Sequence, residues 1–282
     1  MSQMPISSKL VGMTFDPVPF SWTAKDVMLY AVGVGAKPEG ELEYVYEGKG
    51  PKVLPTYAVI PGMMSMAGLI TNVEINLAML LHGEQGITLH REIPPEGKAR
   101  VIGKISEVWD KGKAAVIGTE GIVEDDKGPL FTTRATLFIR GAGGFGGERG
   151  PSASAQAVPD RKPDVVVEEL TRPEQGAIYR LSGDNNPIHI DPEFAKMAGF
   201  EKPFMHGLCT YGIVGRAILK MLCKGDPARF VSLDARFADQ VYFGDTIVTK
   251  LWLTGEGQAI VQAETQKGNV VLSQGKTAFK AA

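Results

Sequence analysis

Six segments of the chain alternate apolar and polar residues, and they fall into two groups. The first group lies at residues 100–109, 114–124 and 130–139, and the second at 246–254, 259–265 and 270–279. A period of two is typical of a strand with one buried face, so each group predicts an antiparallel meander. Helical stretches precede both groups. Runs of helix followed by runs of strand indicate an α+β fold rather than alternating βαβ units.

The starts of two helices also repeat between the halves. Thr23 with Asp26, and Thr171 with Glu174, form capping-box patterns, in which a Thr and an acid three residues later satisfy each other's backbone N–H groups. They predict helices that reach residues 30 and 179. Each half also has an apolar residue followed by His-Gly, at 81–83 and 205–207. The apolar stretch 208–222 is expected to cover one face of the sheet. We interpret the chain as two distant copies of one unit.

Residues 141–164 separate these copies. The segment has six glycines in its first ten positions, followed by Pro, Ser and charged residues, which is typical of a linker between units at 1–140 and 165–282. Gly141, Gly143 and Gly146 also match GxGxxG. A dinucleotide site needs a helix directly after that motif, and a Pro-containing coil follows here, so we do not expect one.

Composition excludes several classes of protein. The 282 residues suit about two domains, and 30 Lys plus Arg against 32 Asp plus Glu leave a net charge of −2, which does not favour nucleic acid as a partner. The only cysteines, Cys209 and Cys223, lie in one apolar segment and form no disulfide framework. With no signal-like N-terminus and no long apolar run, we expect no membrane partner and a cytoplasmic location.

The densest chemistry lies in the segment YRLSGDNNPIHIDP at residues 179–192. Asp191 precedes Pro and a short helical stretch ending at Gly199, so we interpret it as a helix cap. Pro187 keeps the residue before it out of the helical region, so Asp184 and His189 can face one pocket across a bend. An Asp and a His can hold one water and exchange its protons, as adding or eliminating water requires. The alternative is an Asx turn at Asp184 and a buried structural His189.

Other kinds of site are poorly supported. The four histidines show no metal-ligand spacing, so no metal is expected. There is no GxSxG motif for a serine nucleophile, and Cys209 is explained as a small apolar residue. Met63, Met64 and Met66 suit the core or a flexible pocket wall.

Residues 179–212 closely resemble the signature of the MaoC-like dehydratases, and specifically of the (R)-specific type 2 enoyl-CoA hydratases. The first half is also similar to theirs, at residues 30–35, 46–48, 54–56, 82–85 and 110–112 and in the glycine segment. The resemblance implies a double hotdog fold, in which each half wraps an antiparallel sheet around a long helix. It also implies that only the C-terminal half keeps the catalytic loop, while the N-terminal half accommodates the acyl chain.

The resemblance further implies roles for individual residues. Asp184 and His189 match the catalytic pair, Asn186 the amide that supports it, and Gly207 the residue whose backbone N–H points at the thioester oxygen. Tyr30 and Glu47 match positions that support activity or the active-site wall. Four more positions match residues that contact the acyl-CoA: His82, Gly83, Lys111 and Phe237. Lys111 can equally be a solvated turn residue. Gln240 and Phe243 replace two prolines common in the family, which puts the shape of that turn in doubt.

The function implied is reversible hydration of trans-2-enoyl-CoA to (3R)-3-hydroxyacyl-CoA by a homodimer without cofactor or metal. The resemblance is to the hydratase portion of a peroxisomal multifunctional enzyme, but the chain ends Lys-Ala-Ala, which is no peroxisomal address. Three alternatives stay open: a dehydratase acting on acyl carrier protein or on a branched or sterol acyl-CoA, a thioesterase, and an acyl-CoA binding protein without turnover.

Overall fold

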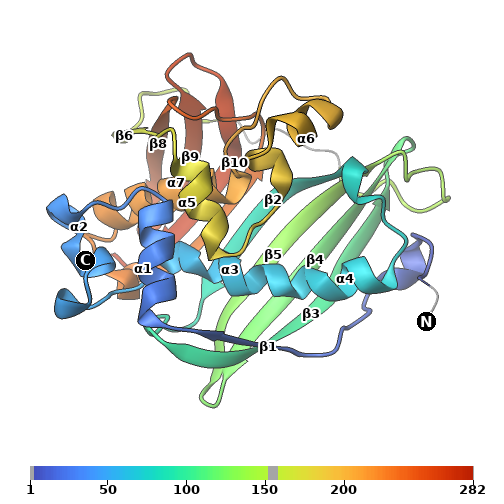
Figure 1. Ribbon diagram of the computed structural model, residues 1–282, viewed down its shortest axis with the longest axis horizontal. Coiled ribbons are helices and arrows are strands. Elements are labelled where there is room, and N and C mark those ends of the chain that lie inside the picture. Colours follow the sequence, from blue (N-terminus) through green and yellow to red (C-terminus); the bar gives the residue numbers. More distant parts are fainter. Residues whose placement is uncertain (1–2, 152–157, 282) are drawn as a thin grey trace.

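The computed structural model describes residues 3–151 and 158–281. In these residues ten strands form one antiparallel sheet, with the main helices over one of its faces (Figure 1). The strands are β1 (Val18–Trp22), β2 (Leu80–Leu89), β3 (Gly97–Asp110), β4 (Ala114–Asp125), β5 (Gly128–Arg140), β6 (Val165–Leu170), β7 (Phe230–Phe237), β8 (Thr246–Gly255), β9 (Gln258–Thr265) and β10 (Val270–Phe279). All six predicted strands are therefore present.

The helices lie mainly between the strands of each half. The α-helices are α1 (Ala24–Gly33), α2 (Pro38–Val45), α3 (Val59–Gly62), α4 (Ala67–Asn72), α5 (Gln175–Tyr179), α6 (Pro192–Met197) and α7 (Gly207–Met221). The short 3₁₀ helices are η1 (Ser8–Leu10), η2 (Glu47–Lys49), η3 (Pro55–Ala58), η4 (Met63–Met66), η5 (Leu77–Met79), η6 (Arg180–Ser182), η7 (Pro187–His189) and η8 (Pro227–Arg229).

The strand order shows the duplication. It runs β1-β3-β4-β5-β2-β7-β10-β9-β8-β6, so the second half repeats the order of the first, read from the opposite edge. β2 and β7 pair at the centre, with Glu84 opposite Arg236 and Thr88 opposite Ser232. An ion pair between Arg134 and Asp234 (2.9 Å) also crosses this junction. The two halves share one continuous sheet, as a double hotdog fold requires.

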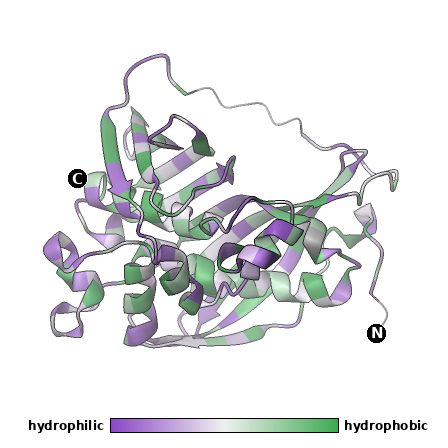
Figure 2. Cartoon of the chain, turned by 45° about the horizontal axis from the view of Figure 1, so that its top comes forward, coloured by the Kyte–Doolittle hydropathy of each residue, from purple (hydrophilic) through white to green (hydrophobic). Residues whose placement is uncertain are grey.

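A central helical segment crosses the sheet in each half. α7 lies across the strands of the second half, where Leu208, Tyr211 and Ile218 are buried, so the prediction for the apolar stretch at 208–222 is confirmed. In the first half α3 and α4 cross β3 to β5 (Figure 1). Figure 2 shows hydrophilic and hydrophobic bands alternating along strands of the sheet. This is the pattern of strands with one face covered by helices.

Two details of the predicted repeat need correction. At α1 the capping box is present, since the backbone N–H of Thr23 donates to Asp26 Oδ2 (2.8 Å). The second one is wrong: the Thr171 hydroxyl accepts the Gly244 N–H (3.0 Å) and donates to the Asp245 carbonyl (2.7 Å), and α5 begins only after Glu174. The equivalence of the two His-Gly motifs is also wrong. The motif at 81–83 lies inside β2, held by pairing with β5, whereas the motif at 205–207 starts α7.

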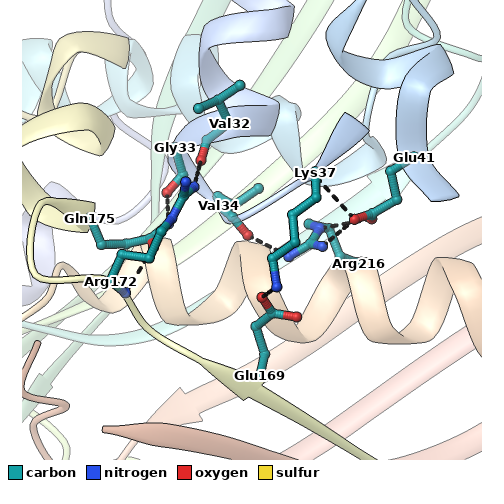
Figure 3. Close-up of polar contacts among 9 residues, drawn as sticks. All are labelled: Val32, Gly33, Val34, Lys37, Glu41, Glu169, Arg172, Gln175 and Arg216. Atoms are coloured by element: carbon teal, nitrogen blue, oxygen red, sulfur yellow. Dashed lines mark hydrogen bonds and ion pairs between the residues drawn. The ribbon is translucent and has the colours of Figure 1, made fainter. Parts of the chain in front are cut away.

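Side chains of the second half bind the carboxyl end of α1 (Figure 3). Three successive carbonyls accept hydrogen bonds: Val32 from Arg172 (3.2 Å), Gly33 from Gln175 (2.5 Å) and Val34 from Arg216 (2.8 Å). Arg216 is 8% exposed and also donates from Nε to Glu41 Oε1 (3.0 Å). Because a buried guanidinium needs partners for its N–H groups, this contact fixes α7 against α1 and α2.

The glycine segment is folded against the first half. The Asp110 carboxylate accepts backbone N–H groups from Gly112 (2.8 Å), Gly144 (2.8 Å) and Gly146 (2.9 Å). These bonds favour the charged form and hold the pKa of Asp110 below its ordinary value. Within the described parts of 141–164 there is no helix, in agreement with the coil predicted after the glycine motif, while residues 152–157 lie outside the described chain. None of the described helices is long and apolar enough to cross a membrane.

Candidate active site

The loop between η6 and α6 carries the predicted pair. Asn186 Oδ1 accepts the Ile188 N–H (3.2 Å) and so caps η7, while the Asn186 N–H donates to Asp184 Oδ1 (3.3 Å). Both bonds are short-range turn contacts of the kind that Asn and Asp side chains favour. Asp191 caps α6 by accepting the N–H groups of Glu193 and Phe194, as predicted. Asn186 therefore shapes the bend on which Asp184 and His189 sit.

The bend brings Asp184 and His189 together with a third residue, His206. One polar side-chain atom of each lies within 4.8 Å of the others. His189 is 8% exposed and His206 is fully buried. The predicted pairing of Asp184 with His189 thus agrees with the geometry, and the short local turn at Asp184 is present as well.

Hydrogen bonding fixes the form of His189. Its Nδ1 lies 2.9 Å from the Phe204 carbonyl oxygen, which can only accept, so Nδ1 carries the hydrogen and Nε2 keeps its lone pair. Burial lowers the pKa of His189 below its ordinary value of about 6.5, because the charged imidazolium is poorly solvated there. At neutral pH this side chain is an uncharged base.

The two imidazoles also lie against each other. The ring centroids of His189 and His206 are 4.0 Å apart, and the planes of the rings are tilted by 34°. The three side chains offer ligand atoms close enough together to hold a metal ion. The spacing of the histidines along the chain does not indicate this grouping, because it does not show which of them meet in the fold.

A backbone donor lies next to this cluster. Gly207 directly follows His206 and is the first residue of α7, a position whose N–H has no acceptor within the helix. A Cβ at Gly207 would lie 3.1 Å from the ring of Phe237, so glycine leaves room here. His82 of β2 contacts the same Phe237 ring edge-on, with centroids 5.1 Å apart. The first half therefore reaches the site through β2, on which Gly83 also lies.

A series of rings connects the cluster to the interior of the first half. Tyr30 is fully buried, packs edge-on against Tyr57 (5.5 Å between centroids) and contacts Tyr179 (6.0 Å). Tyr179 in turn contacts His206 (5.0 Å). Tyr30 is thus separated from His189 by the rings of Tyr179 and His206.

Family models match both halves of the chain. Residues 20–141 match the MFE-2 hydratase 2 N-terminal domain, and residues 154–275 match the MaoC like domain. The chain belongs to the MaoC-like dehydratase family.

Individual relatives agree with this assignment. The chain is 42% identical to 3-hydroxyacyl-thioester dehydratase Y of Mycobacterium tuberculosis, over 99% of this chain and 100% of that protein. It is 42% identical to a probable enoyl-CoA hydratase 2 of Dictyostelium discoideum, over 95% and 94% of the two chains. The crystal structure of a MaoC-like dehydratase from Phytophthora capsici matches with a TM-score of 0.88 at 32% identity, covering 98% of each chain. The double hotdog fold is confirmed.

Two residues implied by the resemblance lie away from the cluster in this MaoC-like dehydratase. Glu47 is exposed on η2, and no hydrogen bond or ion pair joins its carboxylate to another described residue. Lys111 is half-buried at the turn after β3, and its Nζ donates to the Pro151 carbonyl (2.8 Å). This bond joins the turn to the end of the described glycine segment, and contact of Lys111 with acyl-CoA stays a prediction.

The remaining predicted positions mostly support the loop. Gly183, with φ of +132°, packs against Ile60 and Met63, so one of the three methionines adjoins the catalytic loop. Phe243 lies against α5, since a Cβ at Gly176 would be 2.5 Å from its ring, and the same Cβ would be 3.3 Å from the His189 carbonyl oxygen. Cys209 is fully buried, and burial raises the pKa of its thiol, which agrees with an apolar role.

Sequence reasoning about this MaoC-like dehydratase missed His206 and Tyr179 as members of the site. His206 was visible as the residue before Gly207 at the start of a long apolar helix. Nothing in the local sequence indicated that the chain folds back to place it against His189. Tyr179 was visible only as the end of a short helix.

Proposed function

We propose that the protein catalyses the reversible addition of water to trans-2-enoyl-CoA, giving (3R)-3-hydroxyacyl-CoA, in fatty acid metabolism. The observation that carries the proposal is the juxtaposition of Asp184, neutral His189 and the free N–H end of α7 at Gly207. The relatives named as a hydratase and as a dehydratase describe the two directions of one such reaction. The (3R) configuration comes from the family resemblance.

In the proposed reaction one water lies between the Asp184 carboxylate and His189 Nε2. As the water oxygen bonds to C3, His189 Nε2 takes one of its protons, and the electrons of the C2–C3 double bond move towards the thioester. The proton then passes from His189 to C2, so that one molecule of water is added and His189 returns to its neutral form. The Asp184 carboxylate stabilises the transient imidazolium.

The charge that develops on the thioester oxygen needs a donor placed beforehand. The Gly207 N–H supplies it, supported by the positive end of the α7 dipole. Since the thioester itself takes up the electrons, the proposed chemistry needs no cofactor. We infer that the first half accommodates the acyl chain and that His82 and Phe237 contact the substrate near Gly207.

One assay separates this proposal from its alternatives. The protein is mixed with a medium-chain trans-2-enoyl-CoA, loss of the conjugated thioester absorbance is followed, and the configuration of the product is determined. We expect hydration to the (3R) alcohol. An (S) product would contradict the mechanism, release of free CoA would indicate a thioesterase, and binding without turnover would indicate an acyl-CoA binding protein.

The thioester carrier and the acyl group are tested in the same way. Parallel reactions use the enoyl group on acyl carrier protein, and branched or sterol side chains on CoA. We expect the straight-chain CoA ester to react with the highest kcat/KM. The homodimer and the cytoplasmic location stay predictions, which sedimentation and cell fractionation test.

A further inference from the structure

We propose that His206 is a positioning residue that aligns both members of the catalytic pair, its ring orienting His189 and its Nε2–H holding the main chain at Asp184. This inference rests on the proposed function, because positioning matters only if Asp184 and His189 are the catalytic pair. The contacts of His206 with these two residues can be tested without an activity assay. His206 belongs to α7's start, whereas the pair belongs to the loop between η6 and α6. It therefore links the loop with the acid-base groups to the helix with the backbone donor.

The first contact is a hydrogen bond to the loop. His206 Nε2 lies 3.2 Å from the carbonyl oxygen of Asp184. Because a carbonyl only accepts, Nε2 carries the hydrogen. The bond fixes the backbone from which the Asp184 side chain extends, and so fixes where its carboxylate lies.

The second contact is with the ring of His189. One face of that ring stacks on His206, with centroids 4.0 Å apart, and Phe204 lies edge-on to it at 5.0 Å. The Phe204 carbonyl also accepts the His189 Nδ1–H. The imidazole is thus held between two rings and by one hydrogen bond, which leaves Nε2 as its reactive atom.

The electrostatic surroundings keep His206 itself uncharged. Burial lowers the pKa of His206 to about 3, and the nearby His189 and the Arg180 guanidinium act in the same direction, while its bond to the Asp184 carbonyl opposes them. The titratable groups beside the two rings are Asp184, Arg180 and Tyr179. A neutral His206 remains packed on His189 without repulsion when His189 takes up a proton.

Among the described residues, the His206 side chain makes no hydrogen bond other than the one from Nε2 to the Asp184 carbonyl. Its Nδ1 is buried and has no partner among the described residues, and the hydroxyl of the adjoining Tyr179 is likewise without one. A buried imidazole that serves only packing would be replaceable by an apolar ring at no cost. An imidazole that positions Asp184 would not be replaceable in this way, because an apolar ring cannot donate a hydrogen bond to the Asp184 carbonyl.

Two substitutions separate the two contacts. His206→Gln keeps an N–H donor near the position of Nε2 and removes the ring. His206→Phe keeps a ring against His189 and removes the donor. We expect each to lower kcat for enoyl-CoA hydration by about 10- to 100-fold, with KM changed by less than about threefold, because misplacement by about 1 Å costs rate rather than binding. His90→Gln is the matched control, since His90 is exposed just after β2 and bonds the Thr132 hydroxyl of β5.

Nitrogen NMR of the histidines supplies a readout that does not depend on activity. In the wild-type protein we expect His206 to stay neutral with the hydrogen on Nε2 down to about pH 5, since its pKa is far below the ordinary value. We expect His189 to hold its hydrogen on Nδ1. In His206→Gln, without the stacked ring, we expect His189 to populate both tautomers, while His206→Phe keeps the wild-type tautomer.

The outcomes distinguish this inference from the proposed function. If wild-type protein does not hydrate enoyl-CoA, the proposed function fails, and the NMR of His189 still decides the role of His206. Folded variants with wild-type kcat, or a His189 tautomer unchanged in His206→Gln, would overturn the inference. So would titration of His206 near pH 6.5 in the wild-type protein, which needs no variant to fold.

Discussion

The two halves start their central helical segments with different residues. α7 begins at Gly207, which has a backbone N–H, and continues without a break for 15 residues. The corresponding segment of the first half, from η3 to α4, begins at Pro55, and Pro61 lies within α3. Proline has no N–H to donate. The first half therefore lacks a donor where the second half presents one.

The segments that precede these helices also differ, because only the one in the second half carries the predicted acid-base pair. In the second half the chain between α5 and α7 carries Asp184 and His189. In the first half residues 34–54 contain neither Asp nor His, and Glu41 of this segment pairs with Arg216 of the second half. Under the proposed function, the loop and the helix start are what distinguish the catalytic half from the supporting one. The order of the strands is the same in both halves.

Removing either member of the pair tests the catalytic side of this comparison and should have the largest effect. Asp184→Asn or His189→Gln is expected to lower kcat by about 10³-fold, because the water then lacks one of the two groups that exchange its protons. Hydration of enoyl-CoA by the folded variants measures this, with His90→Gln as control. Activity close to wild type in either variant would remove the pair from the mechanism.

Giving the second half the helix start of the first should have the next largest effect. Gly207→Pro removes the N–H, yet proline is favoured at the first position of a helix, and the preceding residue already has a suitable conformation (φ −54°, ψ 133°). We expect kcat to fall by about 10²-fold. Gly207→Ala keeps the N–H and only crowds Phe237, so it should cost less. Equal losses would show that crowding, not the lost donor, is responsible.

Breaking the contact between the halves should reduce stability rather than chemistry. Arg216→Met leaves Glu41, 14% exposed, without its partner and also frees the Val34 carbonyl. We expect the free energy of unfolding to fall by about 3 kcal/mol, measured by urea denaturation. Arg100→Met is the control, because its pair with Glu124 is largely exposed and should contribute less than about 1 kcal/mol. Similar small losses would mean that the buried pair does not join the halves.

The smallest effect is expected at the join between the halves. The pKa of Asp110 is lowered in the folded protein, so its contribution to stability is present above the ordinary pKa and is lost as pH falls through the lowered one. Asp110→Asn should therefore destabilise the protein at pH 7 and flatten its loss of stability on acidification. Thermal unfolding between pH 7 and pH 3 measures both. Parallel pH curves for variant and wild type would show that the glycine segment does not depend on this carboxylate.

The sequence predicted the six meander strands because their alternation is a local property. It missed the other four, β1, β6, β2 and β7, of which β2 and β7 pair with each other across the halves. β2 contains Gly83 and Gly86, which locally favour turns, and only its two distant neighbours in the sheet make it a strand. The capping box at Thr171 was wrong for a similar reason, since the Thr171 hydroxyl accepts the distant Gly244 N–H in place of one at the start of the helix.

The same difference between local and distant contacts decided which residues of the site could be predicted from the sequence. Asp184, Asn186 and His189 were predictable because one short loop carries them. The contact of His206 with His189 depends on the path of residues 190–205 around α6, which no pattern encodes. The burial of Arg216 in an otherwise apolar helix was equally invisible, because its partner Glu41 lies in the other half.

The pairing of β2 with β7 at the centre of the sheet has an evolutionary consequence. Two identical copies that met in this way about a twofold axis would carry every substitution twice. A change that improved one active site would then alter its twin as well. Joining the copies in one chain removes that symmetry, so one copy could acquire Pro55 while the other kept Gly207, and neither lost its place in the shared sheet.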